Sequence, residues 1–443
     1  MKILVTNTVA LNGGDAAILL SIINLLKGEF GQDTEFIVYD SQPEIAKRYY
    51  PQLNFRKLIY QMQTETPTMK YLGDSFISRA LRLFFKKILQ FFLSINPPRF
   101  YFAAWCWQHK FNWITKLLLD NHELQDIENY SSADLIVSTG GTYLVENYPL
   151  KSRIFDYRIS LLMQKPLVFY TQSLGPFLNK NYQSNFREIF NRSLLILLRD
   201  EASFKHLQDI QVDIKKAHVS SDVVFAFTEK LEQENHFNTN SIGNSPLKIA
   251  VSVRNWQYFK TTDAQTGMNI FRESLSAVTK YLVEKYNAEI TYISTCQGIP
   301  DYWNDDSKVA VEIIESLPIE IQKQVNVDRN FHAPQELIKI LNSYDLVIAT
   351  RMHMAILSLV ARTPVFPIAY EFKTKELFQR LEMGEWVQDI ENVQQESIIA
   401  SIQLFIEKLP EIKQKLAINV KKEQKRALES AKRVKTAFEQ YYQ

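Results

Sequence analysis

Arg351 and His353 place an anion-binding side chain and a proton-exchanging side chain two residues apart. A guanidinium holds a phosphate or a carboxylate through two parallel hydrogen bonds, and an imidazole titrates near neutral pH. The pair follows the apolar run 345–349, which is typical of a buried strand, and Thr350 is the expected N-cap of a helix over 352–360. Free N–H groups at a helix start favour an anion, so we expect an anionic substrate here. The alternative is a structural arginine beside a hydrogen-bonded core histidine.

Arg254 ends a second apolar run, 248–253. The carboxyl ends of parallel strands lie on one rim of a sheet, where ligands of such sheets bind. We therefore expect Arg254 and Arg351 to converge on a ligand that carries both phosphate and carboxylate. A strand-end arginine can also be an ordinary surface residue.

Three loops in the first half of the chain follow apolar runs and contain residues that could contact a sugar or a phosphate. They are 11–15 with Gly13 and Gly14, 138–144 with Gly140 and Gly141, and 170–176 with Gln172. Glycine lets the backbone approach a ligand, and an amide side chain can hydrogen-bond a polyol. A tight turn explains each loop equally well, because none has the GxGxxG or P-loop sequence.

Metal chemistry and nucleophilic catalysis are not expected. The seven histidines are scattered, and the acidic residues Asp301, Asp305 and Asp306 have no metal-ligand spacing. No serine or cysteine stands beside a recognisable base. The sequence therefore predicts no metal.

Charge and composition exclude several classes of protein. The 51 basic and 49 acidic residues give a net charge of +2, whereas a nucleic-acid binder concentrates a large basic excess. Two cysteines allow no disulfide framework, which favours a reducing compartment. No run reaches the roughly 18 uncharged apolar residues of a membrane span. We expect a cytoplasmic protein that does not bind nucleic acid, and its oligomeric state stays open.

Apolar runs alternate with helical patterns in two series along the chain. The expected strands are 2–7, 35–40, 133–138, 166–171 and 194–199, then 248–253, 289–295, 345–349 and 365–369. This order predicts an α/β fold of two Rossmann-like, doubly wound domains that face a cleft. The expected domains are 1–243, with a helical insertion at about 55–130, then 244–410, then a basic C-terminal helix over 411–443.

The insertion is rich in aromatic and basic residues, most densely over 78–95. Such a helix can lie on a membrane surface, which would bring the protein to the inner face of the membrane as a peripheral contact. It can equally pack its apolar face on the domain, which is the commoner outcome. The charged C-terminal helix is expected to present a solvated face.

Eight short motifs occur in a fixed order over most of the chain. They are N-G-G-D (12–15), T-G-G (139–141), Y-T-Q-S-L-G-P (170–176), R-D-E-A-S (199–203), S-D-V-V-F (221–225), V-S-V-R-N-W (251–256), R-M-H (351–353) and A-Y-E-F-K (369–373). Together they resemble the polysaccharide pyruvyl transferase family. The resemblance implies a fold similar to that of the two-domain GT-B glycosyltransferases. It also implies transfer of the enolpyruvyl group of phosphoenolpyruvate onto two hydroxyls of a sugar of a cell-surface glycan, or of a lipid-linked precursor, to give a pyruvate ketal.

The resemblance assigns roles to particular residues, with phosphoenolpyruvate as donor substrate and no other cofactor. The catalytic residues would be His353, Arg351 and Arg254, with His353 as acid or base, and the donor site would be Arg254, Arg351, Met352, His353 and Lys373. The acceptor would contact Asn12, Gly13, Gly14, Asp15, Gly140, Gly141, Gln172 and Tyr370. Two alternatives stay open: a GT-B-type glycosyltransferase that uses a nucleotide sugar, and a non-catalytic scaffold of a glycan assembly complex.

Overall fold

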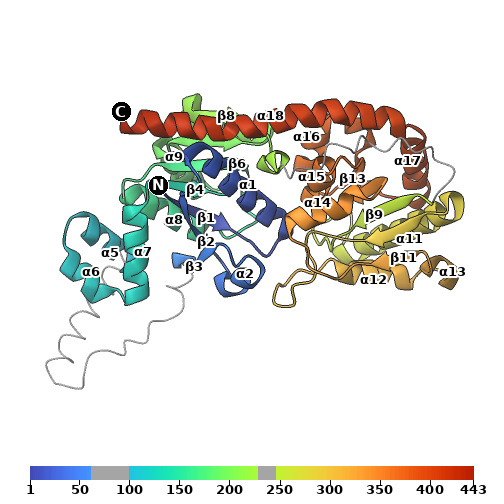
Figure 1. Cartoon of the computed structure of the whole chain (residues 1–443), viewed down its shortest axis with the longest axis horizontal. Helices are drawn as coiled ribbons and strands as arrows, with labels where there is room; N and C mark the ends of the chain where they lie inside the picture. The colour runs from blue at the N-terminus through green and yellow to red at the C-terminus, as the bar shows by residue number, and fades with distance from the viewer. Residues whose placement is uncertain (61–98, 228–245) are drawn as a thin grey trace, which may run out of the picture. The chain divides into compact units, whose positions relative to one another are not determined.

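The computed structural model describes residues 1–60, 99–227 and 246–443, which form two compact units (Figure 1). The first unit contains Met1–Val9, Leu26–Val219 and Lys432–Gln443, and the second contains Ala10–Leu25 and Ser220–Ala431. Each unit is built on a parallel sheet with helices, so the predicted class of two parallel-sheet α/β domains is confirmed. The basic aromatic stretch 78–95 lies outside the described residues, as does most of the insertion before residue 99.

The sheet of the first unit has the strand order β3-β2-β1-β4-β6-β7-β8, with β5 paired to β6. Its strands are β1 (Lys2–Thr8), β2 (Glu35–Asp40), β3 (Asn54–Lys57), β4 (Leu135–Ser138), β5 (Gly141–Leu144), β6 (Leu167–Leu174), β7 (Leu195–Leu198) and β8 (Ala217–Val219). The helices include α2 (Pro43–Tyr49), α5 (Arg99–Gln108), α6 (Asn112–Leu118), α7 (Asn121–Ser132), α8 (Leu150–Leu162), α9 (Lys180–Arg192) and α10 (Glu201–Asp209). The central strands are buried along their whole length, as helices on both faces of a parallel sheet require.

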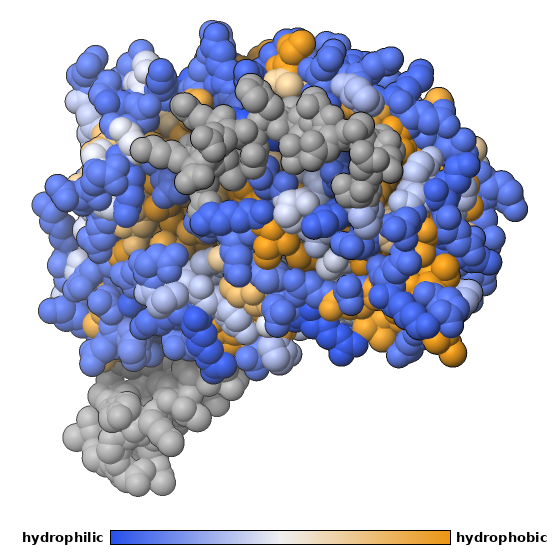
Figure 2. Space-filling model, turned by 45° about the vertical axis from the view of Figure 1, so that its right-hand side comes forward, coloured by the Kyte–Doolittle hydropathy of each residue, from blue (hydrophilic) through white to orange (hydrophobic). Residues whose placement is uncertain are grey.

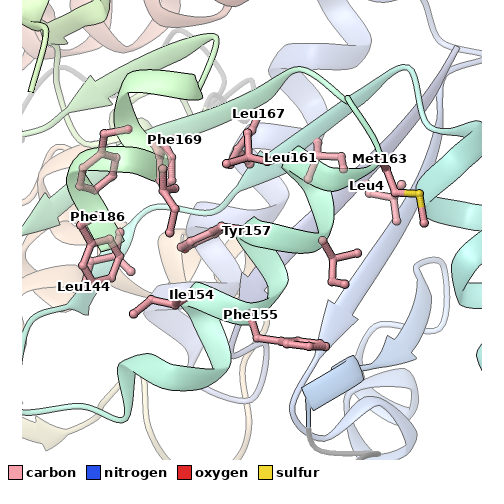
Figure 3. Close-up of a cluster of buried hydrophobic side chains, with 14 of the residues drawn as sticks. Leu4, Leu144, Ile154, Phe155, Tyr157, Leu161, Met163, Leu167, Phe169 and Phe186 are labelled. Atoms are coloured by element: carbon pink, nitrogen blue, oxygen red, sulfur yellow. The ribbon is translucent and has the colours of Figure 1, made fainter. Parts of the chain in front are cut away.

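Aliphatic and aromatic side chains together fill the core of the first unit (Figure 3). Phe169 on β6 meets Tyr157 of α8 with ring centroids 4.9 Å apart and Phe190 of α9 at 4.8 Å. Both contacts are edge-to-face, the geometry that adds attraction beyond the apolar area buried. The core therefore fixes β6, whose carboxyl end is used below, against two helices.

The sheet of the second unit has the order β11-β10-β9-β12-β13-β14, and its paired strands are parallel. Its strands are β9 (Lys248–Ser252), β10 (Glu289–Tyr292), β11 (Val325–Val327), β12 (Leu346–Ala349), β13 (Val365–Ala369) and β14 (Gln388–Asp389). Its helices include α11 (Ala264–Tyr286), α12 (Ser307–Glu315), α13 (Ile319–Gln322), α14 (Pro334–Asn342), α15 (Met352–Val360), α16 (Phe372–Arg380) and α17 (Gln395–Glu407). Strands β9 and β12 are neighbours in register, so the chain emerges from both at one edge of the sheet.

The two units do not divide at a single point near residue 244. The start of α1 (Gly13–Phe30) belongs to the second unit, because Gly13 N donates to Thr295 O at 2.9 Å. The end of α18 (Leu409–Tyr442) belongs to the first unit, where Phe438 meets Phe30 with ring centroids 5.3 Å apart. The expected basic tail is thus a helix with a packed apolar side. Most of its lysines and arginines are exposed, whereas Glu423 is buried and accepts from Arg380 Nη2 at 2.7 Å.

After β3, the described part of the insertion consists of the helices α5, α6 and α7. In α5 the residues Phe100, Ala103, Ala104 and Cys106 are buried, and Arg99 donates to Leu118 O at 2.7 Å. No helix in the described residues is long and apolar enough to cross a membrane. On the face drawn in Figure 2, polar side chains cover most of the described surface and apolar ones show between them.

Candidate active site

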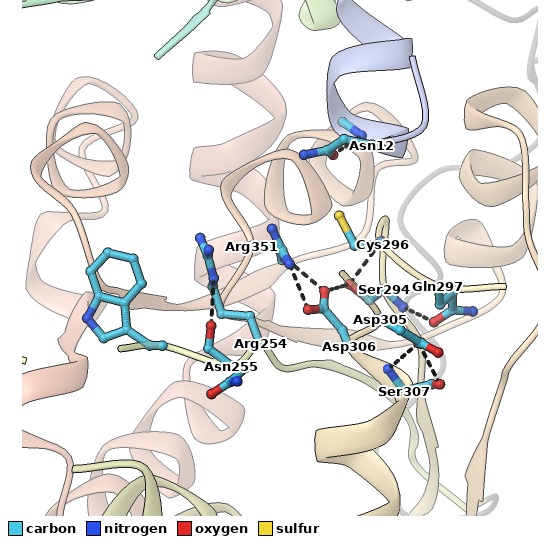
Figure 4. Close-up of polar contacts among 12 residues, drawn as sticks. Asn12, Arg254, Asn255, Ser294, Cys296, Gln297, Asp305, Asp306, Ser307 and Arg351 are labelled. Atoms are coloured by element: carbon cyan, nitrogen blue, oxygen red, sulfur yellow. Dashed lines mark hydrogen bonds and ion pairs between the residues drawn. The ribbon is translucent and has the colours of Figure 1, made fainter. Parts of the chain in front are cut away.

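Arg351 is the N-cap of α15, two residues beyond the end of β12, and only 7% of it is exposed. Its Nε donates to Asp306 Oδ2 at 2.8 Å and its Nη2 donates to Asp306 Oδ1 at 2.7 Å (Figure 4). Burial is the largest single influence and lowers the pKa of Arg351, but the charge and hydrogen bonds of Asp306, together with Cys296 and Tyr370, outweigh burial, so the pKa is raised. The guanidinium edge that the sequence assigned to a substrate anion is therefore held by a protein carboxylate.

Asp306 was not predicted as a site residue, because it was considered only as a metal ligand and its spacing does not suit a metal. It is 1% exposed, and besides Arg351 it accepts a hydrogen bond from the hydroxyl of Ser294. Ser294 follows β10, so the pair joins the loop after β10 to the start of α15. The N-cap also differs from the expected Thr350, whose buried hydroxyl has no hydrogen-bond partner.

Arg254 lies two residues beyond the end of β9 and is half-buried. Its guanidinium carbon is 4.3 Å from the ring centroid of Tyr370 and 5.1 Å from that of Trp256, and the two rings are 4.6 Å apart. The hydrogen bond from Arg254 Nε to Asn255 O is long, at 3.4 Å, and no described carboxylate pairs with Arg254. Aromatic faces thus hold a guanidinium that can still bind an anion.

Lys373 and Met352 are the two further residues predicted for the donor site. Lys373 Nζ is 6.0 Å from the ring centroid of Tyr370 and pairs with Glu371 at 2.7 Å. Met352 begins α15 and is buried, so its side chain serves packing. Tyr370, which the sequence assigned to the acceptor, is therefore placed among the cationic donor candidates.

His353 lies in the first turn of α15 with 14% of its side chain exposed. Its Nε2 is 3.5 Å from Asp222 Oδ2 and has no hydrogen-bond partner. Asp222 also accepts from Val224 N at 3.0 Å, which fixes the carboxylate. Asp222 was not predicted as a site residue, although it begins the D-V-V-F part of one matching stretch, and that motif is the signal that could have found it.

Gly13 and Gly14 bring the start of α1 against this part of the second unit. A Cβ on Gly13 would lie 2.6 Å from Thr295 O, and a Cβ on Gly14 would lie 2.5 Å from His353 Nδ1. Asn12 accepts from Gly14 N at 3.0 Å and so holds the turn. The two glycines allow close packing on the protein itself, where the sequence suggested a ligand.

Cys296 is a buried thiol in the same unit as Arg254 and Arg351. Burial raises the pKa of its thiol to about 12, while Arg351 and Arg254 act to lower the pKa and Asp306 and Asp15 act to raise it. The charges of Arg351, Asp306, Asp15 and Arg254 are thus near enough to Cys296 to influence the pKa of its thiol. No three metal-ligating side chains cluster within the described residues.

The remaining acceptor candidates belong to the first unit. Gly140 has Thr171 Oγ1 2.8 Å from the position of a Cβ, and Gly141 has a φ of +130° that favours glycine. Gln172 is fully buried and donates to Ser138 Oγ at 3.2 Å and to Thr139 O. The predicted acceptor set is thus divided, with Gly140, Gly141 and Gln172 in one unit and Asn12 to Asp15 and Tyr370 in the other.

The family model for polysaccharide pyruvyl transferase matches residues 72–371. The chain belongs to the polysaccharide pyruvyl transferase family. The resemblance seen in the sequence is confirmed, and the match includes Arg254, Arg351 and His353. The chain is also 26% identical over 430 residues to the amylovoran biosynthesis protein AmsJ of Erwinia amylovora, covering 96% of each chain.

Solved structures similar to this one have the GT-B fold. HepE from Anabaena, solved in complex with UDP-glucose, has a TM-score of 0.53 at 13% identity and covers 98% of both chains. A putative UDP-N-acetylglucosamine 2-epimerase from Listeria monocytogenes has a TM-score of 0.55 at 11% identity, covering all of this chain and 96% of that one. At these identities the likeness establishes the GT-B-like fold alone.

Proposed function

We propose that this pyruvyl transferase family member moves the enolpyruvyl group of phosphoenolpyruvate onto a sugar of a cell-surface glycan, or of its precursor, to form a pyruvate ketal. The family and the similarity to a protein named for amylovoran biosynthesis support a transferase in polysaccharide biosynthesis. The donor and the ketal chemistry are argued from the site in the second unit.

Arg254 is the observation that carries the proposal. Its guanidinium lies against the rings of both Tyr370 and Trp256, and it has no carboxylate partner in the described residues. A planar guanidinium binds a phosphate or carboxylate with two hydrogen bonds, and phosphoenolpyruvate offers both groups. Lys373, 6.0 Å from the Tyr370 ring centroid, pairs with Glu371 at 2.7 Å, so Arg254 is the cation assigned to the anion.

Arg351 has a different task in this proposal. Its pair with Asp306 ties the loop after β10 to the start of α15 and so positions His353 two residues further on. Arg351 is then a positioning residue, and its positive charge reaches the donor only weakened by the nearby carboxylate.

His353 would move the protons. The methylene carbon of the donor gains one proton, which makes the adjacent carbon an oxocarbenium-like centre. Two sugar hydroxyls add to that carbon and lose their protons, and the phosphate leaves with the bridging oxygen and one proton. The unpartnered Nε2 of His353 can hold a proton, and Asp222 at 3.5 Å stabilises the charged imidazolium.

The test is incubation of the full chain with phosphoenolpyruvate and a panel of glycan acceptors. The proposal expects phosphate release that depends on the acceptor and a product heavier by one pyruvate less one water. Arg254→Ala is expected to raise the donor KM or abolish release, about 10²-fold or more for a lost charge-assisted bidentate contact. Arg272→Ala is the matched control, because Arg272 pairs with Glu312 on a helix surface.

A nucleotide-sugar glycosyltransferase is the second candidate, because HepE was solved with UDP-glucose. Under that hypothesis UDP would raise the unfolding temperature and phosphoenolpyruvate would not. That result, together with no phosphate release from phosphoenolpyruvate with any acceptor, would overturn pyruvyl transfer. A non-catalytic scaffold would show neither response.

A further inference from the structure

One carboxylate of α18 is buried in the second unit. Glu423 is 1% exposed, whereas Lys421, Lys422 and Lys425 on the same stretch of helix are exposed. A carboxylate that leaves water needs charged partners and hydrogen bonds to compensate for the lost hydration. The partners of Glu423 therefore indicate which part of the second unit depends on it.

Three donors meet the Glu423 carboxylate. Arg380 Nη2, at the end of α16, donates to Oε2 at 2.7 Å, and Arg426 Nη1 donates to Oε1 at 2.8 Å. The hydroxyl of Ser221, which is fully buried, donates to Oε2 at 2.7 Å. The carboxylate thus joins α16 and α18 to the segment that precedes the short helix η2 (Val223–Ala226).

The residue before Ser221 is held by the same two arginines. Ser220 O accepts from Arg380 Nη1 at 3.4 Å, and Ser220 Oγ donates to Arg426 O at 3.1 Å. Hydrogen bonds in a buried network of this kind support one another, since few water molecules compete for the donors. Glu423 and the two arginines therefore fix the position of Ser220 and Ser221.

The residue after Ser221 is the carboxylate that faces His353. Asp222 is the N-cap of η2, which contacts α15, and its Oδ1 accepts from Val224 N at 3.0 Å. Its Oδ2 lies 3.5 Å from His353 Nε2, at the outer limit of a hydrogen bond, so a small displacement decides whether the two groups engage. A rigid peptide plane joins Ser221 to Asp222, so a shift of one moves the other.

We propose that Glu423 is a positioning residue for His353 and acts through Ser221 and Asp222. Its carboxylate fixes the segment that presents Asp222 to the imidazole, although Glu423 lies outside residues 72–371 of the family match. The effect on the rate rests on the proposed function, whereas the effect on the imidazole does not.

Ser221→Ala is the main test, because it removes one hydroxyl and leaves the ion pairs of Glu423 with Arg380 and Arg426 in place. Glu423→Gln keeps the size of the side chain and removes its charge. Glu429→Gln is the matched control, because Glu429 lies on the same helix and is exposed.

Steady-state kinetics with phosphoenolpyruvate and an acceptor should show a lower kcat at an unchanged donor KM. A positioned acid or base contributes roughly 10²–10⁴-fold to a rate, so displacing it should lower kcat about tenfold in Ser221→Ala and further in Glu423→Gln. Glu429→Gln should match the wild type in both constants.

The imidazole signals of carbon-13-labelled histidine provide a readout that needs no substrate. The His353 signal, assigned by its loss in His353→Gln, should shift in Ser221→Ala at constant pH. The signal of His332 should stay, because Asp328 holds His332 within the same unit at 2.7 Å. A substitution that merely loosened the second unit would move both signals.

A wild-type kcat in Ser221→Ala, an unmoved His353 signal, or an equal shift of the His332 signal overturns the proposal. A rise in the donor KM of Ser221→Ala as large as that of Arg254→Ala also overturns it, because the segment would then serve donor binding. Should Glu423→Gln fail to fold, Ser221→Ala still decides. If the wild type releases no phosphate with any acceptor, pyruvyl transfer alone is overturned, and the His353 signal decides the positioning role.

Discussion

Truncation of Asp306 is expected to destabilise the second unit strongly. Asp306 is 1% exposed and Arg351 is 7% exposed, and two hydrogen bonds of 2.7 and 2.8 Å join them. Removing one partner of a buried ion pair leaves an uncompensated charge and costs about 3–5 kcal/mol. Asp306→Ala should therefore lower the free energy of unfolding by about 4 kcal/mol. The double variant Arg351→Met with Asp306→Leu removes both charges and should recover most of that loss.

Urea unfolding followed by tryptophan fluorescence measures these changes, and hydrogen exchange of the amides in α12 and α15 localises them. Glu312→Ala is the control, because Glu312 pairs with Arg272 while both side chains are partly exposed, and its loss should cost about 0–1 kcal/mol. A loss below about 1 kcal/mol for Asp306→Ala would refute the structural role of the pair. So would a double variant no more stable than the single one.

An anion should partly repair Asp306→Ala. With the carboxylate gone, the guanidinium of Arg351 is open to inorganic phosphate, whereas in the wild type Asp306 holds it. Phosphate at ten times its Kd would add about 1.4 kcal/mol to the free energy of unfolding of the variant. If phosphate raised the free energy of unfolding equally in the wild type and the variant, the inference that Asp306 already holds the guanidinium of Arg351 would be contradicted.

Three further predictions concern buried groups. Gly14→Ala should lower the free energy of unfolding by about 1–3 kcal/mol, because its Cβ would lie 2.5 Å from His353 Nδ1. Gly28→Ala in the same helix has open space around it and should raise the free energy of unfolding by about 0.5–1 kcal/mol. Equal effects of the two substitutions in urea unfolding would contradict the steric role of Gly14. Burial raises the pKa of Asp156 to about 7, so the stability that its proton provides is complete below about pH 4 and is lost as the pH rises through 7. Asp156→Asn should flatten that fall in unfolding free energy, and a wild-type profile already flat would refute it. Because burial raises the pKa of Cys296 to about 12, iodoacetamide at pH 7 should label it only after unfolding, as peptide mass spectrometry would reveal.

The central strands could be predicted from the sequence because both of their faces are buried. The expected strands 2–7, 248–253 and 345–349 correspond to β1, β9 and β12 within one or two residues. Strands at or near the sheet edges were missed, among them β3 and β14, which have no fully buried residue. A search for apolar runs finds a strand covered on both sides and overlooks one that is half exposed.

The site could be predicted only as far as local sequence defines it. The strand ends placed Arg254 and Arg351 at one edge, and the register of β9 and β12 agrees. The ion pair between Arg351 and Asp306 joins residues 45 positions apart, and nothing in the local pattern around Asp306 indicates it. The left-handed backbone of Asn7 at the end of β1, with a φ of +65°, could not be predicted either. A left-handed residue inside an apolar strand carries no sequence signal unless it is glycine.

The two arginines at this edge show why residue type alone does not define a ligand site. Arg351 and Asp306 cancel each other's charge, so their shared hydrogen bonds organise the loop after β10 and attract little from outside. Arg254 lies against the rings of Tyr370 and Trp256, which hold a guanidinium without using its N–H groups. The uncompensated positive charge therefore belongs to Arg254. A donor anion that binds this unit must approach the face of the site where Tyr370 and Trp256 hold that guanidinium.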